Sequence, residues 1–423
     1  MRGFSATMAT LALLGAAWTD GVTFANNGPR AESFPMPAPK IDGLVESEAA
    51  WQHGAVLGNF TLLGKGQPAA AQTRVRVGHD SRALYVGFSC DLPPGTRPQA
   101  TPRARDEEVY RDEAIELFLA PDPQKPQRYF HFIVNAAGSV QDEIGRDAAW
   151  NTEWQAKTIQ AEGRWEAEIA IPWASLPIPP AAGNTWRVNF CRNCLATGEL
   201  SSWAPCETTF HYPERFGYLS GINVDFVPLA RQTLASRIKS VLGDAEAFLA
   251  AGKGRPGPLW ERVQREAASI QERLKRTLAG LSAGDRSALM QAEEELEQEE
   301  QRLGAVQRLA ARAEMASQAT ALGDGSWAVC IESPMRKIPA AQPYIGKPTR
   351  EALVELARNE YESIQLVVVP LGEALRNVRV QIGALRGPGG AMLAGEHVGL
   401  RRIGYVNVTQ PSGGGTLPPG LLP

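Results

Sequence analysis

The period of the hydrophobic pattern changes twice along this 423-residue chain, and this constrains the fold more than any other feature. Over residues 40–225, short alternating runs are bounded by Gly, Pro, Asn and Asp, as in an all-β sandwich or barrel. Over residues 227–322, apolar residues recur every three or four positions, as on one face of a helix. Strand-like runs return after Gly325. The sequence therefore predicts a modular, mainly β protein with an α-helical insert.

Six segments of the first region have the length and composition of β-strands, and few helices are expected among them. The segments are 73–77, 83–90, 114–120, 129–135, 165–171 and 186–192. Alternation in 114–120 puts Ile115 on an apolar face and Glu116 on a mixed face. In 129–135 it puts Phe132 on the apolar face and His131 on the mixed one. Polar residues on an outward sandwich face usually meet water.

The second region predicts a helical hairpin or a three-helix spacer, with turns at 252–258 and 282–285. Leu289, Leu296 and Leu303 repeat every seven residues, which predicts a coiled-coil-like seam. The acidic cluster at 293–300 is interpreted as a solvated helix face.

The third region, 325–423, contains three strand-like runs at 362–369, 378–382 and 398–408. They predict a second β-sandwich-like domain. Few residues remain after them to complete a large fold, so we expect this domain to be incomplete and the chain to be a truncated gene product.

Residues 1–25 have the features of a secretory signal: Arg2, an apolar run at 8–18, and small residues near Ala17 or Ala25. The run is too short to span a bilayer, and no later stretch approaches the roughly 20 apolar residues that a span needs. We therefore expect a secreted or periplasmic protein without a transmembrane segment. A misassigned start codon before a cytoplasmic protein is the alternative.

Composition and motifs exclude several classes of protein. A net charge of −3 argues against a nucleic-acid partner. The sequence has no phosphate-cradling glycine loop, no nucleophile elbow and no metal-binding His-Glu-x-x-His helix. The five histidines show no ligand spacing. No catalytic residue is identified, and whether the protein is an enzyme stays open.

The five cysteines allow three interpretations. Cys191, Cys194, Cys206 and His211 imitate a zinc ligand set but offer only one closely spaced pair. Cys194 and Cys206 are also suited to closing a small loop by a disulfide in an oxidising compartment. The third interpretation is that the cysteines are buried small apolar residues.

Segment 106–142 carries the most functional information. Glu116, His131 and Asn135 share the mixed face and supply an acceptor, a titratable ring and an amide, the groups that hydrogen-bond sugar hydroxyls. Tyr110 precedes the first strand and offers a ring for the apolar face of a sugar. Asn135 is equally suited to forming a turn, because Ala-Ala-Gly follows it.

The tryptophans of the first region divide into two groups by their context. Trp165, Trp173 and Trp186 lie in or beside apolar strands and are predicted core residues. The others lie in polar, loop-like context and are the ones suited to touch a ligand: Trp150, Trp154 and Trp203.

An ordered series of motifs runs through residues 40–221: KIDGLVESEAAW, ALYVGF, YRDEAIELFLAPD, YFHFIVNAAG, GRWEAEIAIPWASL, WRVNFCR and PERFGYL. This series resembles the family 9 carbohydrate-binding modules. The resemblance implies a β-sandwich that binds the ends of glucan or xylan chains between two aromatic rings. By position, Tyr110 and Phe210 correspond to the rings, Glu116 to a strand carboxylate and Asn135 to an amide. Ile133 stands where binding members have an Arg.

The resemblance also implies structural calcium, for which the acidic loop of Asp106, Glu107 and Glu108 is the candidate.

Residues 325–423 resemble the N-terminal β-domain of family 123 glycoside hydrolases. The motifs that carry this resemblance are RNEYESIQLVVVP, LRNVRVQI and a Tyr-Val-x-Val strand at 405–408. In such proteins an Asp-Glu pair in a following barrel acts on O-glycosyl bonds, and no barrel is visible here.

These observations favour a secreted protein that binds a poly- or oligosaccharide during polysaccharide breakdown. The predicted binding residues are Tyr110, Glu116, His131, Asn135, Trp203 and Phe210. Catalysis is expected in a glycoside hydrolase partner or in a missing C-terminal domain. The alternative is that the β regions are non-binding structural spacers of a truncated glycoside hydrolase.

Overall fold

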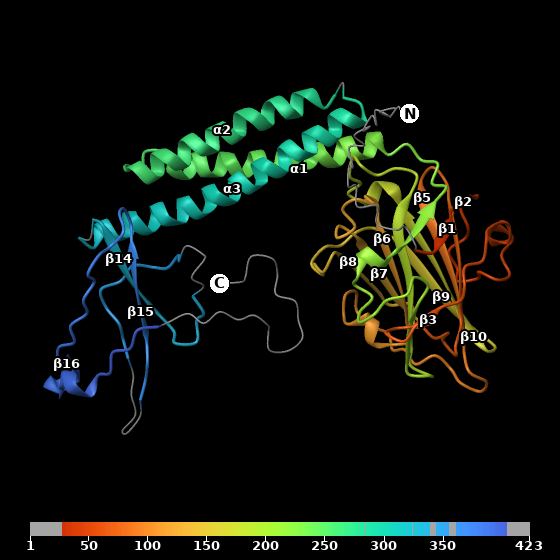
Figure 1. Cartoon of the computed structure of the whole chain (residues 1–423), viewed down its shortest axis with the longest axis horizontal. Helices are drawn as coiled ribbons and strands as arrows, with labels where there is room; N and C mark the ends of the chain where they lie inside the picture. The colour runs from red at the N-terminus through yellow and green to blue at the C-terminus, as the bar shows by residue number, and fades with distance from the viewer. Residues whose placement is uncertain (1–27, 283, 324, 339–343, 355–360, 404–423) are drawn as a thin grey trace, which may run out of the picture. The chain divides into compact units, whose positions relative to one another are not determined.

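The computed structural model describes residues 28–282, 284–323, 325–338, 344–354 and 361–403 (Figure 1). The predicted signal peptide at 1–25 and the Tyr-Val-x-Val strand at 405–408 lie outside these residues. The chain forms two compact units, Met1–Ala230 and Arg231–Pro423.

The first unit contains two sheets. The larger follows the order β1-β13-β11-β6-β7-β8, with β12 paired to β11 and β3 paired to β12. Its strands are β1 (Arg30–Glu32), β3 (Thr61–Leu62), β6 (Ala114–Ala120), β7 (Phe130–Asn135), β8 (Val140–Ile144), β11 (Trp186–Cys194), β12 (Glu199–Ser202) and β13 (Gly217–Ser220). The smaller follows the order β2-β4-β5-β10-β9. Its strands are β2 (Phe34–Pro35), β4 (Thr73–His79), β5 (Ala83–Asp91), β9 (Gln155–Ala161) and β10 (Arg164–Pro172). All six predicted segments are strands.

The two sheets share one hydrophobic core, to which alternate residues of their inner faces contribute. Ile115 of β6 and Phe132 of β7 lie in it, as alternation predicts. Trp165, Trp173 and Trp186 are also fully buried there, which confirms the prediction for these rings. We refer to this unit as the two-sheet domain.

Burial of the outer face of β6 and β7 rules out the alternative that Glu116 and His131 simply meet water. Glu116 and His131 are 6% and 1% exposed. One end of the face is covered by the 3-10 turn η2 (Val109–Arg111), whose Val109 packs with Ala114 and Ile133. The other end is covered by residues 206–216, called here the covering segment, which contribute Phe210 to a second apolar cluster. Periodicity did not reveal this cover, because it comes from segments distant in sequence.

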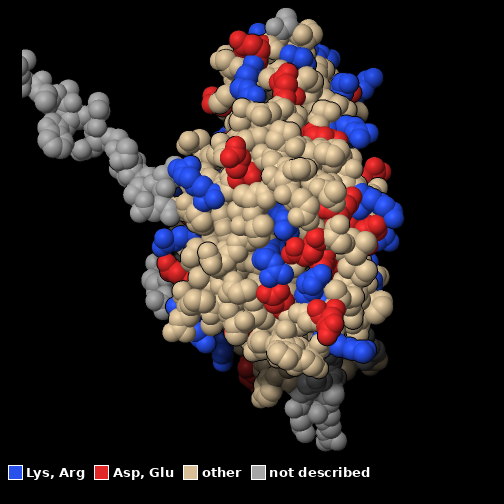
Figure 2. All heavy atoms as spheres, turned by 90° about the vertical axis from the view of Figure 1, so that its right-hand side faces the viewer, with Lys and Arg blue, Asp and Glu red and all other residues tan. Residues whose placement is uncertain are grey.

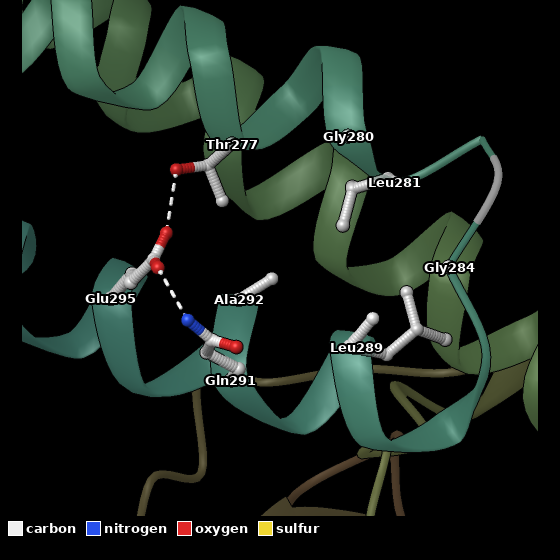
Figure 3. Close-up of a pocket in the computed structure, with 9 residues that line it drawn as sticks. Thr277, Gly280, Leu281, Gly284, Leu289, Gln291, Ala292 and Glu295 are labelled. Atoms are coloured by element: carbon white, nitrogen blue, oxygen red, sulfur yellow. Dashed lines mark hydrogen bonds between the residues drawn. The ribbon is translucent and has the colours of Figure 1, made fainter.

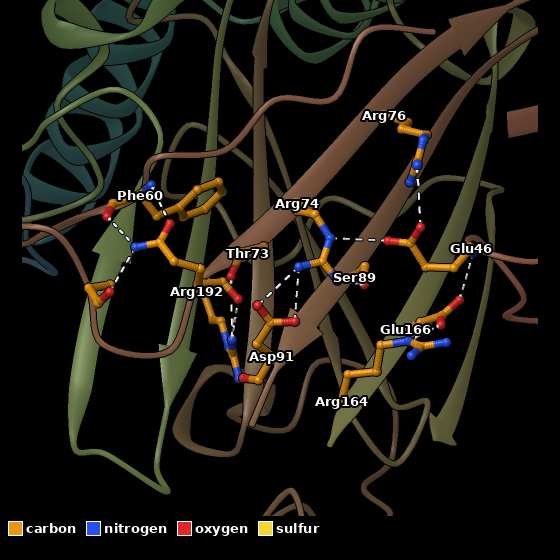
Figure 4. Close-up of polar contacts among 12 residues, drawn as sticks. Glu46, Phe60, Thr73, Arg74, Arg76, Ser89, Asp91, Arg164, Glu166 and Arg192 are labelled. Carbon is orange, nitrogen blue, oxygen red and sulfur yellow. Dashed lines mark hydrogen bonds and ion pairs between the residues drawn. The ribbon is translucent and has the colours of Figure 1, made fainter. Parts of the chain in front are cut away.

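Buried charge also lines the outer face of β4, β5 and β10, where segment 42–51 folds over the strands. The Glu166 Oε2 atom accepts the backbone amides of Val45 at 2.7 Å and Glu46 at 3.0 Å. Figure 4 shows the neighbouring pairs, in which the Glu46 carboxylate accepts from Arg74 Nε at 3.2 Å and Arg76 Nη2 at 3.3 Å.

Glu168 holds the same segment by three hydrogen bonds. Its Oε2 atom accepts the amides of Asp42 at 2.8 Å and Gly43 at 2.7 Å, and its Oε1 atom accepts the indole Nε1–H of Trp51 at 2.7 Å. Burial raises the pKa of Glu168 to about 7, although these donors oppose the shift. The carboxylates of Glu166 and Glu168 on β10 therefore fix the segment that covers this strand.

Charged side chains on the open surface are mixed in sign. In the view of Figure 2, Lys and Arg side chains alternate with Asp and Glu over the visible face, which agrees with the net charge of −3. That face therefore has no continuous patch of positive charge to which a polyanion would bind.

Three helices follow: α1 (Val227–Gly252), α2 (Pro258–Gly280) and α3 (Arg286–Ala321). The helices are separated at the two predicted turns, 252–258 and 282–285. Leu289 and Leu296 are buried, but the next buried positions are Glu299 and Val306 rather than Leu303. A straight helix drifts away from a seven-residue repeat, so the predicted seam does not continue. None of the helices in the described part of the chain is long and apolar enough to cross a membrane.

The prediction that the acidic cluster of α3 is a solvated helix face is wrong for two of its carboxylates. Glu293 and Glu299 are buried and form ion pairs. Arg237 of α1 donates to Glu293 at 3.2 Å, and Arg302 donates to Glu299 at 2.6 Å. These two carboxylates are therefore part of the helix contacts.

A small pocket lies where α2 ends and α3 begins, beside Thr277 and Glu295, and Figure 3 shows its lining.

Among the described residues after Gly325 there are two pairs of antiparallel strands. β14 (Trp327–Glu332) pairs antiparallel with β15 (Gln365–Pro370), and β16 (Leu385–Arg386) pairs with β17 (Met392–Leu393). β15 confirms most of the strand predicted at 362–369, but 378–382 is not a strand. A strand needs a hydrogen-bonded partner, and 378–382 has none among the described residues. The described residues therefore do not form the predicted second sandwich.

Candidate functional site

Polar side chains from three neighbouring strands meet on the outer face of the larger sheet. In the register of the sheet, Glu116 of β6 lies opposite Ile133 of β7, and Ile133 lies opposite Gln141 of β8. In the next row, His131 of β7 lies opposite Glu143 of β8. Residues in adjacent rows of one face are within side-chain reach. Together with His211 of the covering segment, the four polar residues Glu116, His131, Gln141 and Glu143 are called here the polar cluster.

His131 is at the centre of the polar cluster. Its Nε2 atom is 2.8 Å from Glu116 Oε2, and its Nδ1 atom is 3.5 Å from Glu143 Oε2. Its ring stacks on Phe118, with ring centroids 4.0 Å apart and planes at 12°. Burial lowers the pKa of His131, but the two carboxylates outweigh burial and raise the pKa above its usual value.

His211 reaches the polar cluster from the covering segment. Its ring meets the His131 ring edge-on, with centroids 4.9 Å apart and planes at 88°. Its Nδ1 atom is 2.8 Å from the Tyr129 hydroxyl. Burial, aided by the positive charge of His131 and Arg146, lowers the pKa of His211 to about 4, so this ring is neutral near pH 7.

Apolar groups close the face around His211. Phe118, Tyr129, Phe210 and Phe216 pack together with Cys191 and Cys206. All five cysteines are free and buried, in agreement with the interpretation as small apolar residues and against a Cys194–Cys206 disulfide. Burial raises the pKa of the Cys191 and Cys206 thiols, which disfavours the thiolate that binds metal.

Tyr110 lies at the other end of the face, on η2. Its side chain is 41% exposed, and its carbonyl accepts the Asn193 Nδ2–H at 2.7 Å. Its neighbour Val109 covers Ile133, so the residue that replaces the family's Arg is an apolar contact. Tyr110 therefore presents an open ring beside the buried polar cluster.

The predicted site residues divide into three sets. Glu116 and His131 are brought together by a hydrogen bond, and Tyr110 is exposed near them. Trp203 is 8% exposed and lies in the main core, where its ring contacts Phe190 with centroids 5.5 Å apart. Phe210 is 6% exposed within the apolar cover. The loop-like sequence around Trp203 did not reveal this burial.

Asn135 forms the turn between β7 and β8. Its side-chain oxygen accepts the amides of Ala137 at 3.1 Å and Ser139 at 2.8 Å. Its amide nitrogen donates to Asp112 Oδ2 at 2.8 Å. Gly138 completes the turn with a φ of 85°, which an L side chain rarely adopts. In this structure Asn135 has the turn-forming role that its sequence context also allowed.

Sequence reasoning missed Gln141 and Glu143, and it named His211 only as part of a zinc-like set with three cysteines. β8 was not recognised as a strand, because VQDEI is mostly polar. Its signal is the turn of Asn135 and Gly138, which predicts a hairpin and thereby places Glu143 opposite His131. His211 had no such signal, because it is 80 residues from His131 along the chain and no pattern links them.

The acidic loop does not match the calcium site that the resemblance implies. Asp106 Oδ1 accepts the amide of Asp142 at 3.2 Å, and Glu107 Oε2 accepts the amide of Ala104 at 3.1 Å. Glu108 forms an ion pair with Arg111 at 2.7 Å. The three carboxylates point to different donors and are not gathered around one ion. Among the residues that the structure describes, the one group of His, Cys, Asp or Glu gathered closely enough to hold a metal is His131, Glu143 and His211.

Comparison with known proteins identifies the two-sheet domain. The sequence model of the family described as "Carbohydrate family 9 binding domain-like" matches residues 41–220. We refer to residues 41–220, which this family model matches, as the family 9-like domain. This family 9-like domain accounts for less than half of the chain. A protein of Arthroderma benhamiae named "Extracellular protein" is 22% identical over an alignment of 183 residues, and the match covers 37% of this chain and 82% of that protein.

Two solved structures are also similar to the family 9-like domain. Both are of a carbohydrate-binding module of family 9 from Caldicellulosiruptor kristjanssonii. The complex with cellotriose has 18% identity, a TM-score of 0.35, and coverage of 45% of this chain and 93% of that chain. The complex with glucose has 16% identity, a TM-score of 0.32, and coverage of 47% and 96%.

Proposed function

We propose that the family 9-like domain binds a poly- or oligosaccharide through the outer face of its larger sheet. The family match of residues 41–220 supports the class of ligand. The observation that carries the location is the exposed ring of Tyr110 beside a face whose polar groups converge on Glu116 and His131. An open aromatic ring next to hydrogen-bonding groups is what an amphipathic sugar ring requires.

Within this proposal the predicted residues have different roles. Tyr110 contacts the apolar face of the sugar, and Glu116 accepts hydrogen bonds from its hydroxyls. His131 positions Glu116 by the 2.8 Å contact between Nε2 and Oε2. Phe210, Trp203 and Asn135 hold the surrounding backbone. Because Glu116 is only 6% exposed, full access of a sugar to its carboxylate requires movement of η2 or of the covering segment.

We place this domain in a secreted or periplasmic protein that acts in polysaccharide breakdown. The signal-like residues 1–25 and the name of the Arthroderma benhamiae relative support export. The resemblance of residues 325–423 to the N-terminal domain of family 123 glycoside hydrolases supports association with such an enzyme. β15 forms within the RNEYESIQLVVVP motif that carries this resemblance.

A second candidate function is that of a non-binding structural spacer. The burial of Phe210 favours the spacer function, because Phe210 corresponds to the second of the two rings that enclose the sugar and is not exposed to solvent. The same experiment separates the two functions.

The test is a glycan array probed with the full chain, followed by calorimetric titration of each hit. We expect binding that Tyr110→Ala weakens about tenfold, since an aromatic contact contributes up to about 1.5 kcal/mol. Tyr361→Ala is the matched control, because Tyr361 is fully exposed and lies outside the family 9-like domain. Equal affinity in wild type and Tyr110→Ala would refute the proposed location. Silence of the folded protein across the array would favour the spacer.

A further inference from the structure

We propose that His131, Glu143 and His211 bind a divalent transition-metal ion, with zinc the best match to the ligand set. The ligand-bearing atoms of these residues all lie within 4.8 Å of one another. Two imidazole nitrogens and one carboxylate oxygen form a ligand set that zinc uses in proteins. Nitrogen ligands also distinguish the site from calcium and magnesium, which prefer oxygen. The proposal does not depend on carbohydrate binding.

The ligands come from elements that the fold holds firmly. His131 lies on β7 and Glu143 on the neighbouring strand β8, directly opposite each other in the register. His211 lies in the covering segment, and its ring packs edge-on against Phe118 with centroids 5.3 Å apart. The His131 ring also packs against Phe118, in a stacked arrangement. Both rings are therefore oriented by packing before any ion binds.

Each ligand also has a partner that fixes its orientation. The Nε2 atom of His131 is 2.8 Å from Glu116, and Nδ1 of His211 is 2.8 Å from the Tyr129 hydroxyl. Gln141 Nε2 donates to Glu143 Oε1 at 2.8 Å. Such outer partners, a carboxylate on one histidine above all, are typical of metal sites. They leave His131 Nδ1, His211 Nε2 and Glu143 Oε2 for the ion.

The size of the site requires a small contraction. Ligand atoms about 2.1 Å from a tetrahedral ion lie roughly 3.4 Å apart, so the widest separation of 4.8 Å must close by about 1.4 Å. Glu143 and His211 are partly exposed, and rotation of their side chains provides this movement. Three protein ligands leave a fourth position for water or for an oxygen of another molecule.

Two carboxylates face the site, that of Glu143 as a ligand and that of Glu116 behind His131. Arg146 approaches from the side of Tyr129 and His211 and is exposed to solvent. The competing explanation is that His131 is an imidazolium between two carboxylates and binds no metal.

The test uses the tag-free full chain, stripped with a chelator and dialysed. Zn²⁺ is titrated by calorimetry at mildly alkaline pH, and Co²⁺ is added separately as a spectroscopic probe. We expect one ion per chain, Co²⁺ absorption bands of a four-coordinate site, and a higher melting temperature with Zn²⁺. His211→Ala and Glu143→Gln are each expected to weaken Zn²⁺ binding by more than tenfold. Tyr129→Phe, which removes an outer partner, is expected to weaken it about tenfold.

The matched control is His53→Ala, because His53 is exposed and outside the polar cluster. It is expected to bind Zn²⁺ as the wild type does. Circular dichroism establishes that each variant is folded, and Glu143→Gln keeps the side-chain shape if His211→Ala does not fold. Absence of Zn²⁺ and Co²⁺ binding, or equal binding by wild type and folded Glu143→Gln, would overturn the proposal. Because no glycan is present, either result leaves the carbohydrate proposal to its own test.

Discussion

The two outer faces of the two-sheet domain both bury charge, but they satisfy it differently. On the face of β10, Glu166 and Glu168 accept backbone amides of segment 42–51, so the chain itself supplies their partners. On the face of β7, His131 is surrounded by other titratable side chains. A buried carboxylate with backbone donors fixes a fold, whereas a group of buried titratable side chains is a candidate site for a ligand. The comparison separates a structural face from a functional one.

The largest expected effect is on the structural face. Glu168→Ala leaves the amides of Asp42 and Gly43 and the indole of Trp51 without their acceptor. Each orphaned buried donor costs about 1–3 kcal/mol, so we expect a loss of at least about 3 kcal/mol in the free energy of unfolding. Urea denaturation followed by tryptophan fluorescence measures it. Glu162→Ala, at an exposed position, is the control and should change little. A loss below about 1 kcal/mol for Glu168→Ala would remove the structural role.

A double-mutant cycle measures the next effect, on the functional face. His131→Phe keeps the stacking on Phe118 but removes the partner of buried Glu116. We expect His131→Phe to cost about 2 kcal/mol in the free energy of unfolding. Glu116→Gln and His131→Phe should be coupled by about 1–2 kcal/mol, because the two residues share one hydrogen bond. Additive effects in urea denaturation would show that the polar cluster is not connected as described.

The pH dependence of stability distinguishes the two faces further. The pKa of Glu168 is raised from its ordinary 4.5 to about 7, so the folded state keeps a proton that the unfolded chain releases. The contribution of Glu168 to stability should therefore fall as the pH rises from about 4.5 to about 7. Glu168→Gln does not titrate and lacks this dependence. Urea denaturation of both proteins across this range measures the difference, and a difference that rises with pH would contradict the assigned shift.

The smallest expected effect concerns Tyr110. Because its side chain is 41% exposed, Tyr110→Ala should change the free energy of unfolding by about 0.5 kcal/mol or less. The same denaturation measurement checks this. A larger loss would mean that Tyr110 serves the fold, and that weakened glycan binding by this variant is indirect.

The sequence predicted the local structure better than the contacts between distant segments. Alternation gave the strands and the inward residues such as Ile115 and Phe132, because a strand has a fixed period of two. It did not give the cover of the outer faces, since segment 42–51 and the covering segment fold over strands distant in sequence. For the same reason Trp203 was placed wrongly in polar, loop-like surroundings, although it is buried in the core.

The candidate site was predicted in part. Glu116 and His131 lie on one face, as alternation predicts, and Tyr110 lies on η2 at one end of this face. The hydrogen bond between Glu116 and His131 depends on the pairing of β6 with β7, which their sequence proximity indicates. The meeting of His131 with His211 depends on tertiary structure alone, and no spacing rule reports it.

Hydrogen exchange of the full chain, with and without a bound oligosaccharide from the array, tests the central claim most directly. The account predicts that binding slows exchange in peptides containing Tyr110 and Glu116, with little change in segment 42–51. Slower exchange in segment 42–51 and none around Tyr110 would contradict it, because the ligand would then occupy the face that we assign to structure.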